Sequence, residues 1–212
     1  MQLRELQQLL LGLYDVDVAE DVRDFLVTDS AWRATGRTGA AEQLLIGEGS
    51  EELSLALYLE SAVLARVEAR SMTGQLEAAH RDEFFLVLEG VSHFNYVAWN
   101  ATHDKCVTLL ELELQAEVDK FVSACVLAGA ITPEARNALF AHLFAAPAFD
   151  PALEPVETRR YHTANHLAGR YCRSLAERYP AAPVAGMLRE LRAFYRWPQP
   201  AKLSHIHAAV FA

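Results

Sequence analysis

The sequence lacks the long apolar runs that would place it in a membrane. Its purely apolar stretches, such as Phe84–Leu88 and Val97–Trp99, are far shorter than the roughly 20 residues that span a bilayer. The first residues also lack the basic segment and apolar stretch of a secretory signal. We therefore expect a cytoplasmic protein with no transmembrane helix and no membrane partner.

Cysteine is scarce, and its spacing excludes a disulfide framework. Cys106, Cys125 and Cys172 are widely separated and form no CxxC pair. A structural zinc site or a set of disulfides would need closer or paired cysteines. Each cysteine stands in an apolar, helical context, so we expect three buried free thiols.

Catalytic signatures are absent as well. The chain contains no GxSxG elbow, no GxxxxGK[ST] phosphate loop, no GxGxxG dinucleotide motif and no HExxH zinc motif. No catalytic residue can be named from a motif, and enzymatic activity stays an open question. The leading interpretation is a non-enzymatic intracellular interaction or accessory protein with a protein partner or with self-association.

The composition is that of a folded protein with an uneven distribution of charge. Of 212 residues, 52% are hydrophobic and 22% are charged, and the formal net charge is −9, which disfavours nucleic acid as a partner. Residues 1–154 contain 10 basic and 25 acidic side chains, whereas residues 155–212 contain 9 basic and 3 acidic ones. We expect the basic part to dock on the acidic part. The alternative is an exposed anion-binding face.

Apolar periodicity predicts a helix and a small sheet in the first 60 residues. Met1–Leu13 has the three-four spacing of an amphipathic helix. Glu42–Leu59 reads as an antiparallel hairpin with a turn at Gly47–Ser50, and Phe25–Thr28 is a candidate third strand. Arg33–Gly39 is expected to be a loop.

The rest of the chain has the residue pattern of a series of helices. Capping signals and periodicity predict six helices. They cover Ser61–Arg70, Gln75–Ala101, Lys105–Gly129, a segment from Pro133 onward, Val156–Tyr179 and Val184–Tyr195. Ser71–Gly74 caps the second of them, Pro147–Pro155 is a linker, and Ser204–His207 is expected to be a frayed end. The predicted fold is α+β and mainly helical, with an N-terminal helix and a small antiparallel sheet followed by a bundle of five or six helices. It forms one domain over residues 1–212, divided into 1–60, 61–146 and the docked basic helices of 156–212.

One polar stripe on the helix around Phe84–Trp99 is the best candidate for chemistry. Asp82, Glu89, His93, Tyr96 and Asn100 share one side of a helix that is otherwise apolar. The stripe is either a line facing solvent or a polar line pointing into the bundle.

If the stripe points inward, Glu89 and His93 are candidate metal ligands, and Glu117 on the next helix is the third. Carboxylates and imidazoles facing each other across helices are how non-haem iron or manganese sites are built. The i,i+4 spacing of Glu89 and His93 differs from the Glu-x-x-His of ferritin-like di-metal sites. A helical enzyme dependent on iron, manganese or zinc is therefore the first alternative function, and no other cofactor is predicted.

A second polar face lies on the helix from Val156. Arg159, His162, His166, Arg170 and Arg173 share this face, opposite an apolar one. They are candidates for binding an anion or an acidic partner. The second alternative function is thus an anion or nucleic-acid binder that uses the C-terminal arginines.

Overall fold

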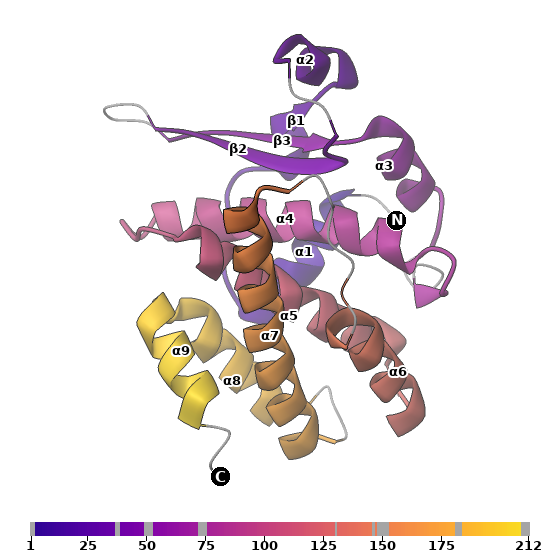
Figure 1. Ribbon diagram of the computed structural model, residues 1–212, viewed down its shortest axis with the longest axis vertical. Helices are drawn as coiled ribbons and strands as arrows, with labels where there is room; N and C mark the ends of the chain where they lie inside the picture. The colour runs from indigo at the N-terminus through magenta and orange to yellow at the C-terminus, as the bar shows by residue number, and fades with distance from the viewer. Residues whose placement is uncertain are drawn as a thin grey trace. The chain divides into compact units, whose positions relative to one another are not determined.

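A computed structural model describes residues 3–36, 39–48, 53–71, 76–129, 131–145, 147, 153–180 and 184–208. Within these residues the chain forms nine α-helices, one short 3-10 helix and a three-stranded sheet (Figure 1). The elements are α1 (Leu3–Tyr14), η1 (Val22–Phe25), β1 (Leu26–Val27), α2 (Asp29–Ala34), β2 (Glu42–Glu48), β3 (Leu53–Leu59), α3 (Ser61–Glu68), α4 (Arg81–Ala101), α5 (Leu109–Ala128), α6 (Pro133–Phe144), α7 (Pro155–Arg178), α8 (Ala185–Arg196) and α9 (Gln199–Ala208). The predicted α+β, mainly helical fold class is confirmed.

The chain divides into two compact units. The first comprises Met1–Gly12 and Val16–Cys106, and the second comprises Leu13–Asp15 and Val107–Ala212. The last residues of α1 therefore belong to the second unit. The single-domain organisation expected from the sequence stays a prediction.

The sheet of the first unit has the strand order β1-β3-β2. The predicted hairpin is confirmed, because β2 and β3 pair in antiparallel fashion with Glu42 opposite Leu59. The third strand is also present, but β1 runs parallel to β3. This corrects the expectation of a wholly antiparallel sheet: α2 and β2 intervene between β1 and β3, and such a long connection allows parallel pairing. Half of the predicted turn, at residues 49 and 50, lies outside the described residues.

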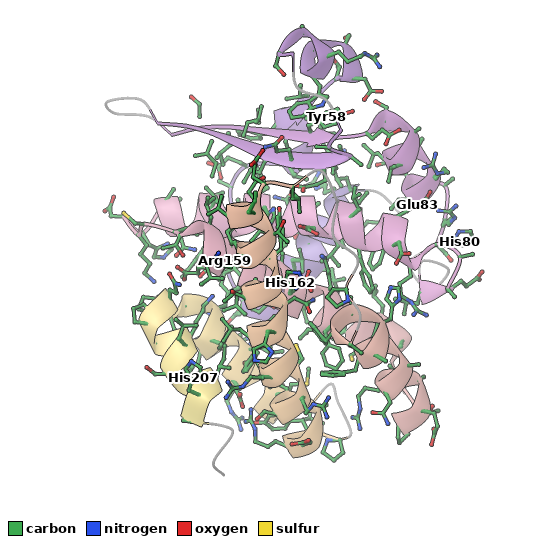
Figure 2. The ribbon with its side chains drawn as sticks, viewed as in Figure 1. Tyr58, His80, Glu83, Arg159, His162 and His207 are labelled. Atoms are coloured by element: carbon green, nitrogen blue, oxygen red, sulfur yellow. The ribbon has the colours of Figure 1, made fainter. Side chains whose placement is uncertain are left out.

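The two faces of the sheet carry different neighbours because side chains alternate along a strand. Leu57 and Leu59 lie on the face that contacts α4. Tyr58, labelled in Figure 2, is on the other face of the sheet. Its ring stacks on that of Trp32 in α2, with 4.4 Å between the ring centroids. Helix α2 includes the first two residues of the loop predicted at Arg33–Gly39, and the other described residues of that segment lie outside any helix or strand. The N-cap of α2 is Thr28, whose side chain accepts a hydrogen bond from the Ala31 amide.

Helix α4 is buried on most sides, as the apolar sequence of Phe84–Trp99 predicts. Fifteen of its residues are buried, and its ring contacts include Phe94 with Phe25 of η1, at 4.9 Å between centroids. Asn95 accepts a hydrogen bond of 3.2 Å from Gln7 of α1. The helix begins at Arg81, later than the predicted Gln75. Most of its predicted cap, residues 72–74, lies outside the described residues.

In the second unit, α5 and α7 make the most extensive helix contact. Thr108 caps α5 by accepting from the Glu111 amide, and Thr132 caps α6 just before Pro133, as predicted. Glu154 and Glu157 form a capping box at the start of α7. The predicted linker at Pro147–Pro155 falls partly outside the described residues.

The C-terminal segment is folded, which corrects the expectation of a frayed end at Ser204–His207. Residues Gln199–Ala208 form α9, and Lys202 and Ile206 are fully buried. Pro200 lies in the first helical turn, where a missing amide hydrogen costs nothing. Pro200 is therefore compatible with the start of α9, although a proline at this position also prevents α8 from continuing.

Buried polar groups of the second unit form a connected network. The Lys202 ammonium donates to Gln115 at 2.9 Å and lies 3.9 Å from the Glu111 carboxylate. Gln115 donates in turn to Asp119 at 2.8 Å. Tyr14 donates its hydroxyl hydrogen to the same Asp119 carboxylate. Burial, and to a smaller extent the negative charge of Asp119, raises the pKa of Tyr14 well above its ordinary value. The hydroxyl therefore keeps its proton.

Several basic side chains of α7–α9 also meet acidic ones within this unit. Arg160 lies 3.5 Å from Glu113, and Arg178 pairs with Glu190. Of these two pairs, the one between Arg160 and Glu113 joins the basic part of the sequence, residues 155–212, to the acidic part, residues 1–154. Docking of the basic helices on the whole acidic part of the chain stays a prediction.

Candidate functional site

The polar stripe of α4 is buried over most of its length. Asp82, in the first turn, is exposed and Glu89 is half-buried, whereas His93, Tyr96 and Asn100 are buried. His93 retains only 5% of its accessible surface. Of the two alternatives that the sequence leaves open, the inward-pointing line is correct from Glu89 onward.

Two residues of this stripe meet a third residue from the sheet. Ligand-type atoms of Glu89, His93 and Glu42 all lie within 4.8 Å of one another. His93 Nδ1 and Glu42 Oε1 are 3.7 Å apart. The predicted pair of Glu89 and His93 is therefore brought together, and the sheet contributes a carboxylate that the sequence analysis did not select.

The close approach of sheet and helix at Gly90 positions Glu42. A Cβ atom built on Gly90 would lie 3.0 Å from Cγ of Glu42 and 3.1 Å from methyl groups of both Leu57 and Leu59. Real Cβ contacts are rarely this short, so a side chain at this position would push the sheet away. Glycine thus lets β2 lie against α4, next to the turn that carries Glu89 and His93.

The pairing of β2 also directs Glu42 toward α4. Glu42 stands opposite Leu59 in the antiparallel ladder, and directly opposed residues project on the same face of a sheet. Leu59 contacts the helix at Gly90. Its partner Glu42 must therefore project toward the helix too.

These three side chains form a donor set suited to a metal ion. Two carboxylates and one imidazole supply oxygen and nitrogen atoms, which fit manganese, iron and zinc better than the all-oxygen sets of calcium. Two carboxylates held this close repel each other, and a bound dication would relieve that repulsion. Three protein ligands also leave coordination positions for water or a substrate.

Glu117, the third predicted ligand, lies on α5 in the second unit. One of its carboxylate oxygens accepts a hydrogen bond from Lys120 at 2.7 Å, and the other accepts one from Asn165 of α7 at 2.7 Å. These contacts are those of a side chain that joins α5 to α7.

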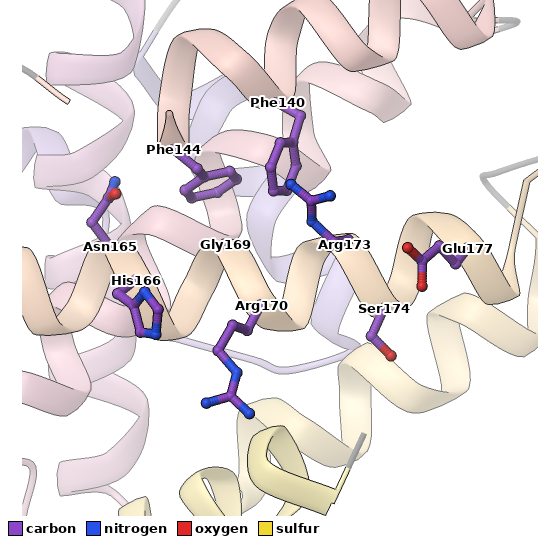
Figure 3. Close-up of a pocket in the computed structure, with 9 residues that line it drawn as sticks. All are labelled: Phe140, Phe144, Asn165, His166, Gly169, Arg170, Arg173, Ser174 and Glu177. Atoms are coloured by element: carbon purple, nitrogen blue, oxygen red, sulfur yellow. The ribbon is translucent and has the colours of Figure 1, made fainter. Parts of the chain in front are cut away.

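The predicted anion-binding residues of α7 divide into two groups. Arg159 and His162, labelled in Figure 2, are exposed on the N-terminal half of the helix. His166, Arg170 and Arg173 line a pocket against α6 (Figure 3). The opposite face of α7 is buried, including Leu167, as the sequence predicts.

The cysteines are free, but the expectation that all three are buried is wrong. Cys106 is exposed, because it follows α4 in a connecting segment outside any helix, whereas Cys125 and Cys172 are buried. Burial raises the pKa of the Cys125 thiol to about 12 and raises that of Cys172 well above its ordinary value. The two buried cysteines are therefore protonated, poor nucleophiles.

Comparisons with protein families, with curated proteins and with solved structures find no match to this chain. Among the described residues, no helix has both the length and the apolar character needed to cross a membrane. The site must therefore be interpreted from its own geometry.

Proposed function

We propose that the first unit binds one divalent transition-metal ion through Glu42, Glu89 and His93. The observation that supports this proposal is the convergence of the three ligand-type atoms within 4.8 Å. An imidazole among carboxylates favours manganese, iron or zinc. The remaining coordination positions would be open to water or to a substrate.

This site favours the alternative of a metal-dependent enzyme. A metal with open positions supplies Lewis acidity and lowers the pKa of a bound water, and these are the properties of catalytic rather than closed structural sites. The interpretation as a non-enzymatic interaction protein rests on the absence of catalytic motifs and on the charge asymmetry of the sequence, and it stays a prediction. In our proposal Glu42 takes the place of Glu117 as the third ligand.

The first test is a metal titration. The full-length protein is treated with a chelator, dialysed, and titrated with Mn²⁺ and Zn²⁺ in a calorimeter. We expect one equivalent of metal to bind the wild-type protein. Glu42→Gln and His93→Gln should each weaken binding at least about tenfold, as loss of a ligand does.

A matched control lies on the same helix. Glu83 is also on α4, but its carboxylate pairs with Arg66 and Arg70. Glu83→Gln should therefore leave metal affinity unchanged, and so should Glu117→Gln. Metal affinity that falls with Glu117→Gln but not with Glu42→Gln would overturn our ligand set in favour of the one predicted from sequence.

Stability provides a second readout. A metal at 100 times its dissociation constant should raise the free energy of unfolding by about 2.7 kcal/mol, and this rise should vanish in His93→Gln. The variant itself should unfold at nearly the same urea concentration as the metal-free wild type, because functional polar groups are often retained at the expense of stability. Equal responses of wild type and variant to metal would refute the site.

A further inference from the structure

A row of basic side chains runs along the exposed side of α7 in the second unit, apart from the metal ligands. Arg159, His166 and Arg173 follow one another at intervals of seven residues, and helical positions seven residues apart differ by only about 20° in direction. His162 and Arg170 stand between them. Arg170 is half-buried and the other four are exposed. These five residues, which we call the basic row, extend over about 21 Å of the helix.

The row widens toward its C-terminal end. Figure 3 shows Arg173 turned to the side of α6 and Arg170 turned to the opposite side of α7. There Arg170 Nη1 lies 3.3 Å from His207 Nδ1 of α9, whereas the Arg173 guanidinium lies over the Phe140 ring of α6, 4.6 Å from its centroid. A rod-shaped partner that lies along α7 would therefore have one arginine on each side.

The arginines of the row differ from other arginines of α7 in their ionic partners. Arg160 meets Glu113, and Arg178 meets Glu190. Among the described residues, by contrast, the three arginines of the row have no carboxylate within ion-pair distance. The row thus carries three positive charges that are available to an acidic partner.

An apolar groove adjoins the row on the side of α6. Between α6 and α7 the structure has a pocket of about 410 Å³ whose lining includes Phe140 and Phe144. A Cβ atom built on Gly169 would lie 3.2 Å from both Cβ and Cγ of Phe144, so the glycine allows this ring to lie directly against α7. A partner that combines acidic with apolar side chains matches both surfaces.

These features favour a peptide over a nucleic acid or a membrane. Proteins that bind single-stranded nucleic acid stack its bases on aromatic faces, but Arg173 covers the Phe140 ring. Helices that lie on membranes insert large apolar side chains among the lipids, and the basic row contains none. A peptide that carries carboxylates beside apolar side chains requires neither feature.

We propose that the basic row and the adjoining groove bind an acidic amphipathic helix of a protein partner. This helix lies along α7, with carboxylates next to Arg159, His166 and Arg173 and with apolar side chains over Phe144. Any α-helix advances by about 10.5 Å every seven residues, so acidic side chains at three-four spacing stay in step with the row. Carboxylates also match the fork of donors on a guanidinium group. Glu177, one turn beyond Arg173 and also exposed, ends the row, because its negative charge repels the partner.

The test uses a fluorescein-labelled helical peptide of about 20 residues, long enough to cover the row. Its glutamates have three-four spacing on one face and are flanked by leucines. Binding to the full-length protein is measured by fluorescence anisotropy, and we expect saturable binding at low salt that weakens as the salt concentration rises. A peptide of the same composition with its glutamates distributed around the helix should bind at least about tenfold more weakly, and so should one with glutamine in place of each leucine.

Two variants of the protein test the ends of the row. Arg159→Gln and Arg173→Gln should each weaken peptide binding about two- to fivefold, as the loss of an exposed ion pair does. The two residues lie too far apart to interact, so their losses should multiply in the double variant. Arg189→Gln on α8 is the matched control, because Arg189 is exposed but lies outside the row, and this change should have no effect. Glu42→Gln should also bind the peptide normally, so failure of this proposal is distinguishable from failure at the metal site.

The proposal is overturned if the acidic peptide does not bind, or if the two arrangements of glutamates bind equally. Equal binding of the leucine and glutamine peptides, or equal losses in Arg159→Gln and Arg189→Gln, would also overturn it. So would tighter binding of a single-stranded oligothymidylate or of vesicles that contain phosphatidylserine, because either result would identify a different partner for the row.

Discussion

Two groups of polar side chains, one in each unit, are arranged in different ways. In the second unit, hydrogen-bond donors alternate with acceptors: Lys202 donates to Gln115, and both Gln115 and Tyr14 donate to Asp119. In the first unit, Glu42, Glu89 and His93 instead direct ligand-type atoms to one place.

This difference separates a structural network from a candidate binding site. A network of matched donors and acceptors holds helices in one arrangement, and removing any member leaves a buried partner without its hydrogen bond. A cluster of lone-pair donors contributes less to folding and more to the binding of a cation. Mutations in the second unit should therefore affect stability, whereas mutations at the cluster should affect ligand binding.

The largest effect is expected at Lys202. Lys202→Met retains most of the side-chain volume but leaves Glu111 buried without its cation, which should lower the free energy of unfolding by about 3 to 5 kcal/mol. Urea denaturation of the two proteins measures this loss. The double variant Lys202→Met, Glu111→Gln should recover part of it, and a loss below about 1 kcal/mol would show that the network is not structural.

Tyr14 gives the next largest effect. Tyr14→Phe keeps the stack on Tyr195, whose ring centroid lies 4.2 Å away, but removes a hydrogen bond to a buried carboxylate. The expected loss is about 1.5 to 3 kcal/mol, measured by thermal and urea unfolding.

Tyr171 provides the matched control for Tyr14. Its ring is fully buried and stacks on Phe194 at 4.0 Å, but its hydroxyl has no hydrogen-bond partner among the described residues. Tyr171→Phe should therefore be neutral or slightly stabilising. Equal losses in the two variants would mean that the hydrogen bond to Asp119 contributes nothing.

Gly90 tests the first unit. Gly90→Ala introduces a methyl group between α4 and the sheet, which should cost about 1 to 3 kcal/mol by overpacking and should weaken metal binding by displacing Glu42. Gly12→Ala is the control, because a Cβ atom there meets nothing within 4 Å and alanine favours a helix by up to about 1 kcal/mol. Metal affinity that is insensitive to Gly90→Ala would show that the helix-to-sheet spacing does not set the ligand geometry.

The smallest effect is expected at Asp21. The side-chain hydrogen bond from Arg23 lowers the pKa of Asp21 to about 2. Because this pKa is lower in the folded protein, the stabilisation is complete above the ordinary pKa of 3.8 and is lost as the pH falls toward 2.

The pair of Asp21 and Arg23 is close to solvent, so water and salt screen it and its contribution to stability is small. Asp21→Asn should therefore be slightly less stable than wild type at pH 6, and the difference should shrink at pH 3. Urea denaturation at the two pH values measures it, and a difference that grows with acidity would contradict the assignment.

Long periodic elements were predictable from the sequence, and short ones were not. Helix α4 has enough turns for its apolar pattern to be evident, and α6 begins where Thr132 and Pro133 predict. Helix α2 has six residues, too few for a pattern, although Thr28 is a capping signal. Helix α9 was missed because Pro198 and Pro200 interrupt the helical pattern after α8, and the residues that follow them were expected to fray.

Half of the proposed metal site was predictable from helical periodicity. Glu89 and His93 lie one turn apart, so helical geometry alone brings them together. Glu42 joins them through the packing of a strand on a helix, which depends on contacts distant in the sequence. A glycine inside a helix was the signal for such a close approach, and Gly90 stands directly after Glu89.

The pairing of β2 with β3 has a consequence for how the protein folds. Successive residues of a strand face opposite sides, so a shift of one residue in the hairpin would turn Glu42 away from α4 and bring Gln43 to that face. A neutral carboxamide binds a cation more weakly than a carboxylate does. If the cluster binds a metal ion as we propose, an ion present during folding would favour the hairpin with Glu42 opposite Leu59 over the hairpin shifted by one residue, and would select among alternative registers of the same chain.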